Sequence, residues 1–416
     1  MTFIHIVTTV IWLSSFILIM YLLYNAVVSA FSLRRTFQLP SHTPEKRFAV
    51  LIPARNEAKV IGNLINSLKR QNYPKHLYKI IVIPNNCTDE TKKVALENGA
   101  NVMDCTERVA TKGEVLSFAF KTIAKEAEPF DACCIFDADN LVGSNFLEEM
   151  NNALCSGAKV AQGYRDSKNP GDSWIASCHS IYYYSVNRLY NHARSVLGLS
   201  AVINGTGFMV HMDVINGLGG WNTVTMTEDL EFSTICTLND IRVHWIPKAR
   251  FYDEQPITFQ QSWMQRLRWS KGAMQCSSNY AGKLLTKAIK GGTIQPVDIL
   301  SLLIAPWIQI ISFISLSATV ILTCLQIKYE LFPQTDLFYR LFISLEGSYL
   351  IPTLITLMVV IIEKKNIRTM AKGILMMWVF VMSWIPINLL CIFNKTVVWH
   401  PIHHTRAITL GELEIQ

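Results

Sequence analysis

The first 33 residues of the chain, from Met1 to Leu33, contain no Asp, Glu, Lys or Arg, and Arg34 and Arg35 close this run. A helix of about 20 apolar residues crosses a lipid bilayer, so the run is long enough for one span. A signal peptide would carry positive charge before a shorter apolar core, whereas here the positive charge follows the run. We therefore expect residues 1–33 to form an N-terminal transmembrane helix.

Three more apolar runs follow a charged central stretch, which extends from residue 34 to about residue 290. They cover residues 299–327, 341–362 (interrupted by Glu346) and 373–394. With 50% hydrophobic residues, the 416-residue chain is also more apolar than a typical soluble enzyme. The pattern predicts about four membrane spans around one water-exposed domain.

Basic residues mark the side of the membrane on which the central domain should lie, because Lys and Arg are enriched in cytoplasmic loops next to spans. Two such clusters occur, one after the first span and one before the last: Arg34, Arg35, Lys364, Lys365, Arg368 and Lys372. They predict a multi-pass protein of the cell membrane with an external N-terminus. The central domain and the 363–372 loop would lie in the cytoplasm.

The C-terminal tail fits this topology less well. Four full crossings would leave the tail outside, but its sequence "KTVVWHPIHHTR" is basic. One apolar run can instead be interfacial or re-entrant, and three prolines offer a place for such a break: Pro306, Pro352 and Pro386. The sequence leaves the side of the tail open.

The ten cysteines indicate neither disulfides nor a metal cluster. Cys133 and Cys134 are adjacent in a predicted buried strand, the others are scattered, and no CxxC pair occurs. We therefore expect reduced core thiols. The net charge of +7 suits a protein beside an anionic lipid leaflet. Because no segment interleaves aromatic and basic residues, we expect no nucleic acid as a partner.

Strands and helices alternate in the central domain. The segment "RFAVLIPARNEAKVIGNLINSLKRQ" predicts a strand over 48–52, a turn at Pro53 and then a helix with apolar residues at helical spacing. The segment "YKIIVIPNNCTDETKKVALENGA" repeats this order, and further strands are predicted near 100–103 and 132–136. The alternation predicts an α/β fold with a mostly parallel sheet covered by helices.

Polar residues follow the predicted strands where each one ends, and ligands bind at this edge of parallel sheets. The groups are Arg55, Asn56 and Glu57, then Asn85, Asn86 and Asp89, then Asp137 and Asp139. The last two lie in "IFDADN", an oxygen-rich acidic turn of the kind that a hard divalent cation shares with substrate phosphates. Taken alone, such a DxD turn can equally be a solvated surface turn.

Two further motifs accompany the acidic turn. "TED" at 227–229 opens a predicted helix, and "QRLRW" at 265–269 lies within the amphipathic stretch "QQSWMQRLRWSKGAMQ". A helix N-cap at Thr227, with acids at the positive end of the helix, would explain the first motif. A helix at the membrane surface would explain the second.

Together, these motifs resemble the D, DxD, TED, QxxRW signature of membrane-embedded family 2 glycosyltransferases, the group of cellulose, chitin, hyaluronan and poly-N-acetylglucosamine synthases. The resemblance covers about residues 47–275 and extends to the flanking spans. It implies a Rossmann-like GT-A fold, a nucleotide-sugar donor, and Mg²⁺ or Mn²⁺ as cofactor. The expected parts are an N-terminal transmembrane helix (1–33), a GT-A domain (34–257) and interface helices with QxxRW (258–295). About three transmembrane helices (296–394) and a C-terminal tail (395–416) follow.

The resemblance assigns donor-binding roles to residues near the strand ends. Glu57 and Asn85 match positions that hold the nucleoside, and Lys112 in "TKGEVLSFAF" matches a lysine beside the diphosphate. Asp137 would lie toward the ribose and the metal, and Asp139 would be the direct metal ligand. Asn85 stands where relatives usually have Asp, but its amide oxygen can still accept a hydrogen bond from uracil N3–H. We therefore expect a UDP-sugar donor.

The remaining motifs match catalytic and acceptor positions. Asp229 would be the general base, Arg268 would neutralise the departing diphosphate, and Gln265 would hydrogen-bond near the same group. The implied acceptor-binding residues are Trp269, Glu228, and Gly205 and Thr206 of "INGTGF". Single displacement would invert the anomeric centre. Other interpretations remain for single features: an interfacial Trp269, a tight turn at "INGTGF", and a core role for the aromatic run "IYYYSVNRLY".

Three functions are compatible with the sequence. The leading hypothesis is a synthase that extends a β-linked polysaccharide and passes it through its own spans. The second is a single sugar transfer to a lipid or polyprenyl acceptor, since ceramide glucosyltransferases carry a close variant of QxxRW. The third is a catalytically silent membrane scaffold, which only the Asn85 exchange favours. The donor sugar, the linkage and the oligomeric state do not follow from the sequence.

Overall fold

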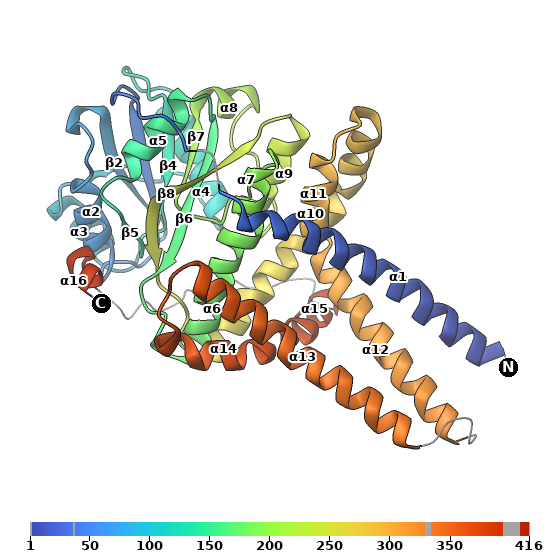
Figure 1. Ribbon diagram of the computed structural model, residues 1–416. Helices are drawn as coiled ribbons and strands as arrows, with labels where there is room; N and C mark the ends of the chain where they lie inside the picture. The colour runs from blue at the N-terminus through green and yellow to red at the C-terminus, as the bar shows by residue number, and fades with distance from the viewer. Residues whose placement is uncertain (1, 36–37, 329–333, 394–407, 416) are drawn as a thin grey trace.

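The computed structural model describes residues 2–35, 38–328, 334–393 and 408–415, and it shows an α/β domain from which long helices project (Figure 1). The strands are β1 Phe48–Ala54, β2 Tyr78–Pro84, β3 Asn101–Val102, β4 Ala132–Ile135, β5 Leu141–Val142, β6 Val160–Ser167, β7 Phe208–His211 and β8 Val243–Asp253. The helices are α1 Thr2–Ala30, α2 Ile61–Lys69, α3 Thr91–Glu97, α4 Lys112–Ile123, α5 Phe146–Cys155, α6 Trp174–Ser185, α7 Ala193–Val196, α8 Met212–Gly217, α9 Glu228–Leu238, α10 Phe259–Gly291, α11 Gln295–Leu303, α12 Ala305–Lys328, α13 Gln334–Ile362, α14 Ile367–Met382, α15 Trp384–Phe393 and α16 Leu410–Ile415. Short 3₁₀ turns lie at Phe31–Leu33 and Lys75–Leu77, and a π-helical segment at Val186–His192 follows α6.

The strands form one sheet, which within the described residues has eight strands in the order β3-β2-β1-β4-β7-β6-β8-β5. β1 pairs in parallel with β2 and β4, β2 with β3, and β6 with β8. β7 runs antiparallel to both of its neighbours, and β5 runs antiparallel to β8. The expected α/β fold with a mostly parallel sheet is confirmed. The four strands β5 to β8 were not predicted, and two of them, β5 and β7, are antiparallel to their neighbours.

Both faces of the sheet are buried, and β1 shows how its sequence achieves this. Leu51 packs into one hydrophobic core and Ile52 into the other, because successive side chains of a strand point to opposite faces. A strand with two buried faces reads as a continuous apolar run. Cys133 and Cys134 of β4 divide between the same two cores. Six of the ten cysteines are buried, as expected for core thiols, whereas Cys324 is exposed.

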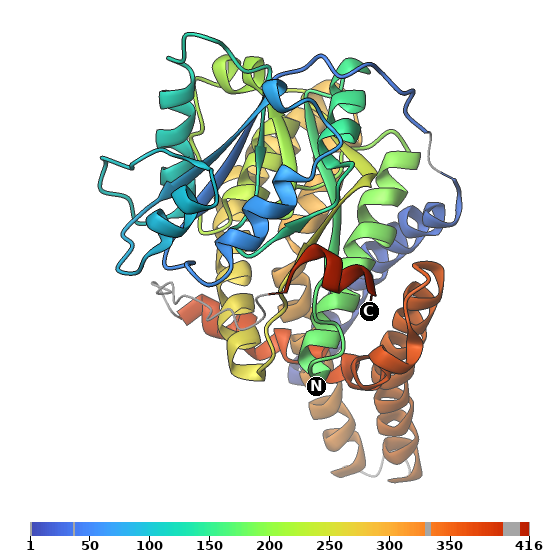
Figure 2. The ribbon, with the colours of Figure 1, turned by 90° about the vertical axis from the view of Figure 1, so that its left-hand side faces the viewer.

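Three segments among the described residues are long and apolar enough to cross a membrane: His5–Leu33, Ala305–Leu325 and Ile367–Phe393. A shorter apolar segment, Glu346–Ile362, forms the second half of α13. α1, α12 and α13 project from the domain, whereas α14 and α15 lie near the bases of α12 and α13 (Figures 1 and 2). The basic tail sequence at 395–406 lies outside the described residues.

The loop between α13 and α14 contacts the α/β domain. Lys365 Nζ lies 2.6 Å from Asp166 Oδ2, and the Tyr164 hydroxyl donates a hydrogen bond of 2.6 Å to Glu363. The Lys365 ammonium group also lies 4.6 Å from the ring centre of Tyr184. These contacts attach the start of α14 to strand β6 and helix α6.

Candidate active site

One cavity of about 930 Å³ lies at the carboxyl ends of β1, β2 and β4, a size typical of ligand-binding sites. The site residues predicted from the sequence that line it are Glu57, Asn85, Lys112, Asp137, Asp139, Gly205, Glu228, Asp229, Gln265, Arg268 and Trp269. Thr206, the remaining predicted site residue, is fully buried behind the acidic turn. Motifs that are far apart in the sequence therefore meet in one place.

The other polar residues at the strand ends shape the turns around the cavity. Asn56 and Asn86 have φ values of 60° and 49°, a left-handed conformation that Asn adopts more readily than most residues. Asp89 accepts hydrogen bonds from two backbone N–H groups of the same region. Asn85 lines the cavity, and its amide oxygen accepts a hydrogen bond of 3.0 Å from Arg55 Nε. Arg55 therefore lines the same end of the cavity as Asn85, the end that is predicted to bind the nucleoside.

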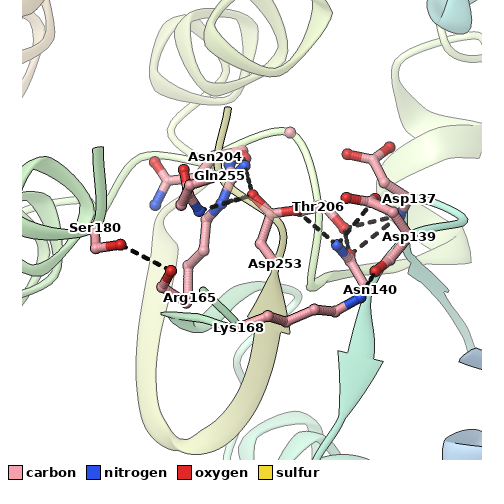
Figure 3. A network of polar contacts seen from close by, with 12 residues as sticks. Asp137, Asp139, Asn140, Arg165, Lys168, Ser180, Asn204, Thr206, Asp253 and Gln255 are labelled. Atoms are coloured by element: carbon pink, nitrogen blue, oxygen red, sulfur yellow. Dashed lines mark hydrogen bonds and ion pairs between the residues drawn. The ribbon is translucent and has the colours of Figure 1, made fainter. Parts of the chain in front are cut away.

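Asp137 and Asp139 lie on a turn that neighbouring side chains hold in place (Figure 3). The backbone N–H of Asp137 donates a hydrogen bond of 2.9 Å to the Thr206 hydroxyl, which itself donates to the Asn140 amide oxygen. Lys168 donates to the backbone carbonyl of Asp139. Buried polar groups therefore fix the turn from behind, and both aspartates line the cavity.

Lys112 connects three parts of the site. Its Nζ forms an ion pair with Asp137, donates a hydrogen bond of 2.7 Å to the Gly205 carbonyl, and lies 3.8 Å from Glu228 Oε1. A capping box starts α4 at this residue and so fixes its position. Burial lowers the pKa of Lys112, but the carboxylates of Asp137 and Glu228 outweigh burial and raise it overall. Lys112 therefore remains a cation.

Glu228 and Asp229 begin α9 and line the cavity. Burial raises the pKa of both carboxyl groups, and that of Glu228 reaches about 7 despite the nearby charge of Lys112. The Thr227 side chain forms no capping hydrogen bond, so a simple N-cap does not account for the TED motif. Glu231 is fully buried and accepts hydrogen bonds of 2.8 and 2.6 Å from two backbone N–H groups of the preceding loop.

Two buried residues that sequence reasoning missed complete the polar network: Arg165 of β6 and Asp253 at the end of β8 (Figure 3). Arg165 forms an ion pair with Asp253 and donates a hydrogen bond of 2.7 Å to the carbonyl of Asn204 in "INGTGF". Its guanidinium carbon lies 3.8 Å from the ring centre of Tyr183. Asp253 also accepts a hydrogen bond of 3.0 Å from Asn140. The pair thus joins the acidic turn to the "INGTGF" loop.

Gln265, Arg268 and Trp269 line the cavity together because helical residues three and four positions apart share a face. Trp269 stacks on Tyr182 of α6 and on Trp384 of α15, with ring centres 6.0 and 6.3 Å apart. Three helices therefore build an aromatic wall of the cavity. The run "IYYYSVNRLY" contributes to this wall as well as to the core.

The acidic turn has the donor chemistry for a hard divalent cation. Asp137 and Asp139 offer carboxylate oxygens on a fixed turn that faces the cavity. Among the described residues, no group of three His, Cys, Asp or Glu side chains forms a ready-made metal site. Mg²⁺ is often bound by one or two carboxylates together with substrate phosphates and water. The residues present therefore fit an ion that shares its ligands with a phosphorylated substrate.

Two curated relatives are similar to part of the chain. A beta-monoglucosyldiacylglycerol synthase of Nostoc sp. is 25% identical over 268 residues, which are 62% of this chain and 55% of the relative. A poly-beta-1,6-N-acetyl-D-glucosamine synthase of Staphylococcus epidermidis is 22% identical over 236 residues, 56% of this chain and 55% of the relative. The chain thus matches about half the length of each.

A solved structure and a family profile identify the fold and the family. The mannosyltransferase PcManGT from Pyrobaculum calidifontis, solved in complex with GDP-Man and Mn²⁺, aligns with a TM-score of 0.60 at 16% identity and covers 91% of this chain and 99% of its own. This likeness confirms the GT-A fold. Residues 44–272, more than half of the chain, match the family described as glycosyltransferase like family 2. The chain therefore belongs to glycosyltransferase family 2.

Proposed function

We propose that the chain is a membrane-bound, inverting glycosyltransferase that transfers a sugar from a nucleotide-sugar donor to an acceptor at the cytoplasmic face of the membrane. One observation carries this proposal: residues at the strand ends and residues of α9 and α10 line the same cavity. A single displacement needs a base near the acceptor and a stabilised leaving group on the opposite side of the sugar. Carboxylates suited to the first role and cations suited to the second line this cavity.

The donor would bind along the ends of β1, β2 and β4. Glu57 and Asn85 would hold the nucleoside, and Lys112 and Asp137 would lie beside the diphosphate and the ribose. Arg55 already donates to the Asn85 oxygen, but an amide oxygen has two lone pairs and can accept a second hydrogen bond from uracil N3–H. A UDP-sugar is our first candidate donor. A GDP-sugar, as in the complex of the mannosyltransferase, is the second.

Asp139, with Asp137 beside it, would hold Mg²⁺ or Mn²⁺. A bound divalent ion would stabilise the negative charge of the diphosphate as a Lewis acid. Lys112 and Arg268 add positive charge to the same cavity, and such fixed charge matters most as negative charge develops on the leaving group. Gln265 would hydrogen-bond to the same group.

Asp229 would act as the general base. The acceptor hydroxyl attacks the anomeric carbon while Asp229 takes its proton, and the bond to the diphosphate breaks on the opposite face. The configuration inverts, so an α-linked donor yields a β-linked product. Glu228, Gly205 and Trp269 line the cavity with Asp229 and would contact the acceptor. Thr206 would act indirectly, through the acidic turn that its hydroxyl holds.

The lining of the cavity favours a lipid as the acceptor. Apolar residues of the helices near the membrane form part of its wall: Leu302, Ala305, Pro306 and Trp384. An amphiphile could place its hydroxyl at Asp229 and its apolar part against this wall. A growing polysaccharide is the second candidate, favoured by the QxxRW motif. It would need a passage through the spans, whereas only a small share of the residues in the apolar windows of α1 and α12 is buried inside the chain.

Membranes that contain the chain, incubated with a panel of radiolabelled nucleotide sugars and Mg²⁺ or Mn²⁺, test the proposal. We expect incorporation from one UDP-sugar or GDP-sugar into a lipid-extractable product. A product of polymer size would support the polysaccharide synthase instead. Membranes from the same cells without the chain provide the background. Incorporation from none of the donors above this background would contradict the proposal.

We predict that the requirement for a divalent ion depends on Asp139. Chelation should abolish transfer, and added Mn²⁺ or Mg²⁺ should restore it. Asp139→Asn should lower transfer and require more added metal, because an amide oxygen binds a hard cation more weakly than a carboxylate. Asp104→Asn, at an exposed residue paired with Lys92, is the control and should behave like wild type. Full activity of metal-free protein would refute the metal assignment.

We also predict an acid limb in the pH profile of kcat/KM that belongs to Asp229. Burial raises the pKa of Asp229 above its usual value of about 3.9. A base works only when deprotonated, so activity should fall as the pH falls through this raised pKa. Glu228→Gln should remove the group with a pKa of about 7 and keep the limb of Asp229. A Glu228→Gln profile without any acid limb would point to Glu228 as the base.

A further inference from the structure

The C-terminal helix α16 packs against the α/β domain. Leu410 is buried, and Thr409 and Leu410 line a hollow of about 220 Å³ whose other wall is formed by residues at or near α2: Asn63, Asn66, Ser67, Lys69 and Arg70. Figures 1 and 2 show α16 against the domain, away from the ends of α12 and α13. If the chain spans a membrane, α16 would therefore lie on the same side of it as the domain.

The segment between α13 and α16 is thus attached to the domain at both ends, because Glu363 and Lys365 contact β6. A segment that crossed the membrane once would end on the opposite side. Two crossings would need about 40 apolar residues, whereas Ile367–Phe393 has 27 residues. The sequence of residues 394–407 contains Lys395 and Arg406 and is too short for a return span. The segment should therefore not cross at all.

The packing of α14 agrees with this conclusion. One face of the helix is buried, at Met370, Gly373, Ile374, Met377 and Phe380, and it lies against α6 of the domain. The contact is close enough for Cys178 of α6 to donate a hydrogen bond of 3.4 Å to the carbonyl of Gly373. α14 is therefore packed directly against the α/β domain.

A buried arginine of the QRLRW motif fixes the junction between α14 and α15. Arg266 is fully buried and donates hydrogen bonds of 2.9 Å to the Phe380 carbonyl and 2.7 Å to the Ser383 hydroxyl. A cation at the C-terminal end of a helix also interacts favourably with the helix dipole. Lys271 makes a similar contact of 2.9 Å with the carbonyl of Cys391 in α15. The active-site helix α10 thus anchors both helices.

We propose that α14 and α15 lie on the membrane surface on the catalytic side, with their outer face against the lipid leaflet, and that the chain crosses the membrane three times, through α1, α12 and α13. The apolar part of α13, Glu346–Ile362, is shorter than the other two spans but reaches the lower limit of about 17 residues for a crossing. The outer face of α14 carries basic residues near its start and apolar residues further along: Arg368, Lys372, Leu375, Trp378 and Met382. This combination matches anionic headgroups and the acyl boundary below them. Because α12 and α13 lie beside α14 and α15 (Figure 1), lipid around these two spans would also reach this face.

In this arrangement, the α14–α15 pair also borders the active-site cavity. Trp384, the first residue of α15, lines the cavity and stacks on Trp269. The interfacial pair would then form the wall between the cavity and the leaflet, and Arg266 would be the residue that positions this wall. The number of crossings does not depend on the identity of the donor sugar.

Epitope tags at the two ends of the full chain test the crossing number. In sealed vesicles whose outer surface carries the catalytic domain, added protease should remove the C-terminal tag and leave the N-terminal tag intact. Vesicles of the opposite orientation should give the reverse result. Protection of both tags in the first vesicles would show that 367–393 crosses the membrane and would overturn the proposal. The assay needs no activity, so its outcome is independent of the proposed transfer reaction.

A photo-crosslinking residue identifies what covers the outer face of α14. Placed at Leu375, which is 53% exposed, it should form adducts with lipid. The same group at the neighbouring Ile374, which is 5% exposed, is the matched control and should react only within the chain. A cross-linked dimer from position 375 would show that a second copy of the chain, rather than lipid, covers this face.

Discussion

Replacing Asp229 with Asn is expected to reduce sugar transfer by about 10²- to 10⁴-fold, which is the usual contribution of a positioned general base. Asn has nearly the same shape as Asp, and its oxygen can still accept the hydrogen bond of 2.8 Å that the Leu230 N–H donates. The variant should therefore fold normally and lose only the group that accepts the proton. Turnover with the labelled donor and titration with the free nucleotide measure the two effects separately.

Nucleotide affinity should stay nearly unchanged in this variant, because the predicted nucleoside positions, Glu57 and Asn85, lie at the ends of β1 and β2 rather than on α9. Asp213→Asn, at a carboxylate that is 69% exposed in α8, is the matched control and should leave turnover unchanged. Normal turnover in Asp229→Asn would rule out this residue as the base. A large loss in Glu228→Gln with normal turnover in Asp229→Asn would transfer the role to Glu228.

The sequence predicts the parts of the fold that depend on local patterns. The strand at 48–52 and the helix after it follow from a short apolar run and from helical spacing, and both are present as β1 and α2. β5 could not be predicted in this way, because it has two residues and exists only through its pairing with β8. The antiparallel direction of β7 also depends on long-range pairing, since it lies between β4 and β6.

In the candidate site, too, some residues follow from local sequence patterns and others depend on long-range strand pairing. Asp137 and Asp139 were predictable because an acidic turn after a buried strand has a local signature. Arg165 and Asp253 were not, because each lies at a strand position that looks structural until β6 and β8 pair and bring the two together. Asp253 lies in "YDEQPITFQQSW", a segment that resembles the family, but nothing near it in the sequence indicates that Arg165 is its partner. Thr206, predicted to contact the acceptor, is buried outside the cavity lining, and its hydroxyl accepts a hydrogen bond from the Asp137 N–H.

The two glycines of "INGTGF" are expected to respond very differently to the same substitution. Gly207→Ala should lower the free energy of unfolding by about 2–5 kcal/mol, which combines the cost of a left-handed non-glycine residue with that of overpacking. Gly207 has a φ of 63°, and an added Cβ would overlap the ring of Phe251 in the core. Phe251 belongs to β8 and is fully buried, so it has little room to move.

Gly205→Ala is the matched variant two residues earlier, and it should affect activity more than stability. Its φ of 80° carries a similar backbone cost of about 1–2 kcal/mol, but the added Cβ would meet no core residue. The methyl group would lie 3.4 Å from Asp229 Oδ2, in the space where the acceptor hydroxyl must approach the base. Thermal unfolding in detergent and the transfer rate distinguish the two variants. If Gly205→Ala kept full activity, the acceptor would not approach Asp229 past this loop, and the proposed acceptor position would be wrong.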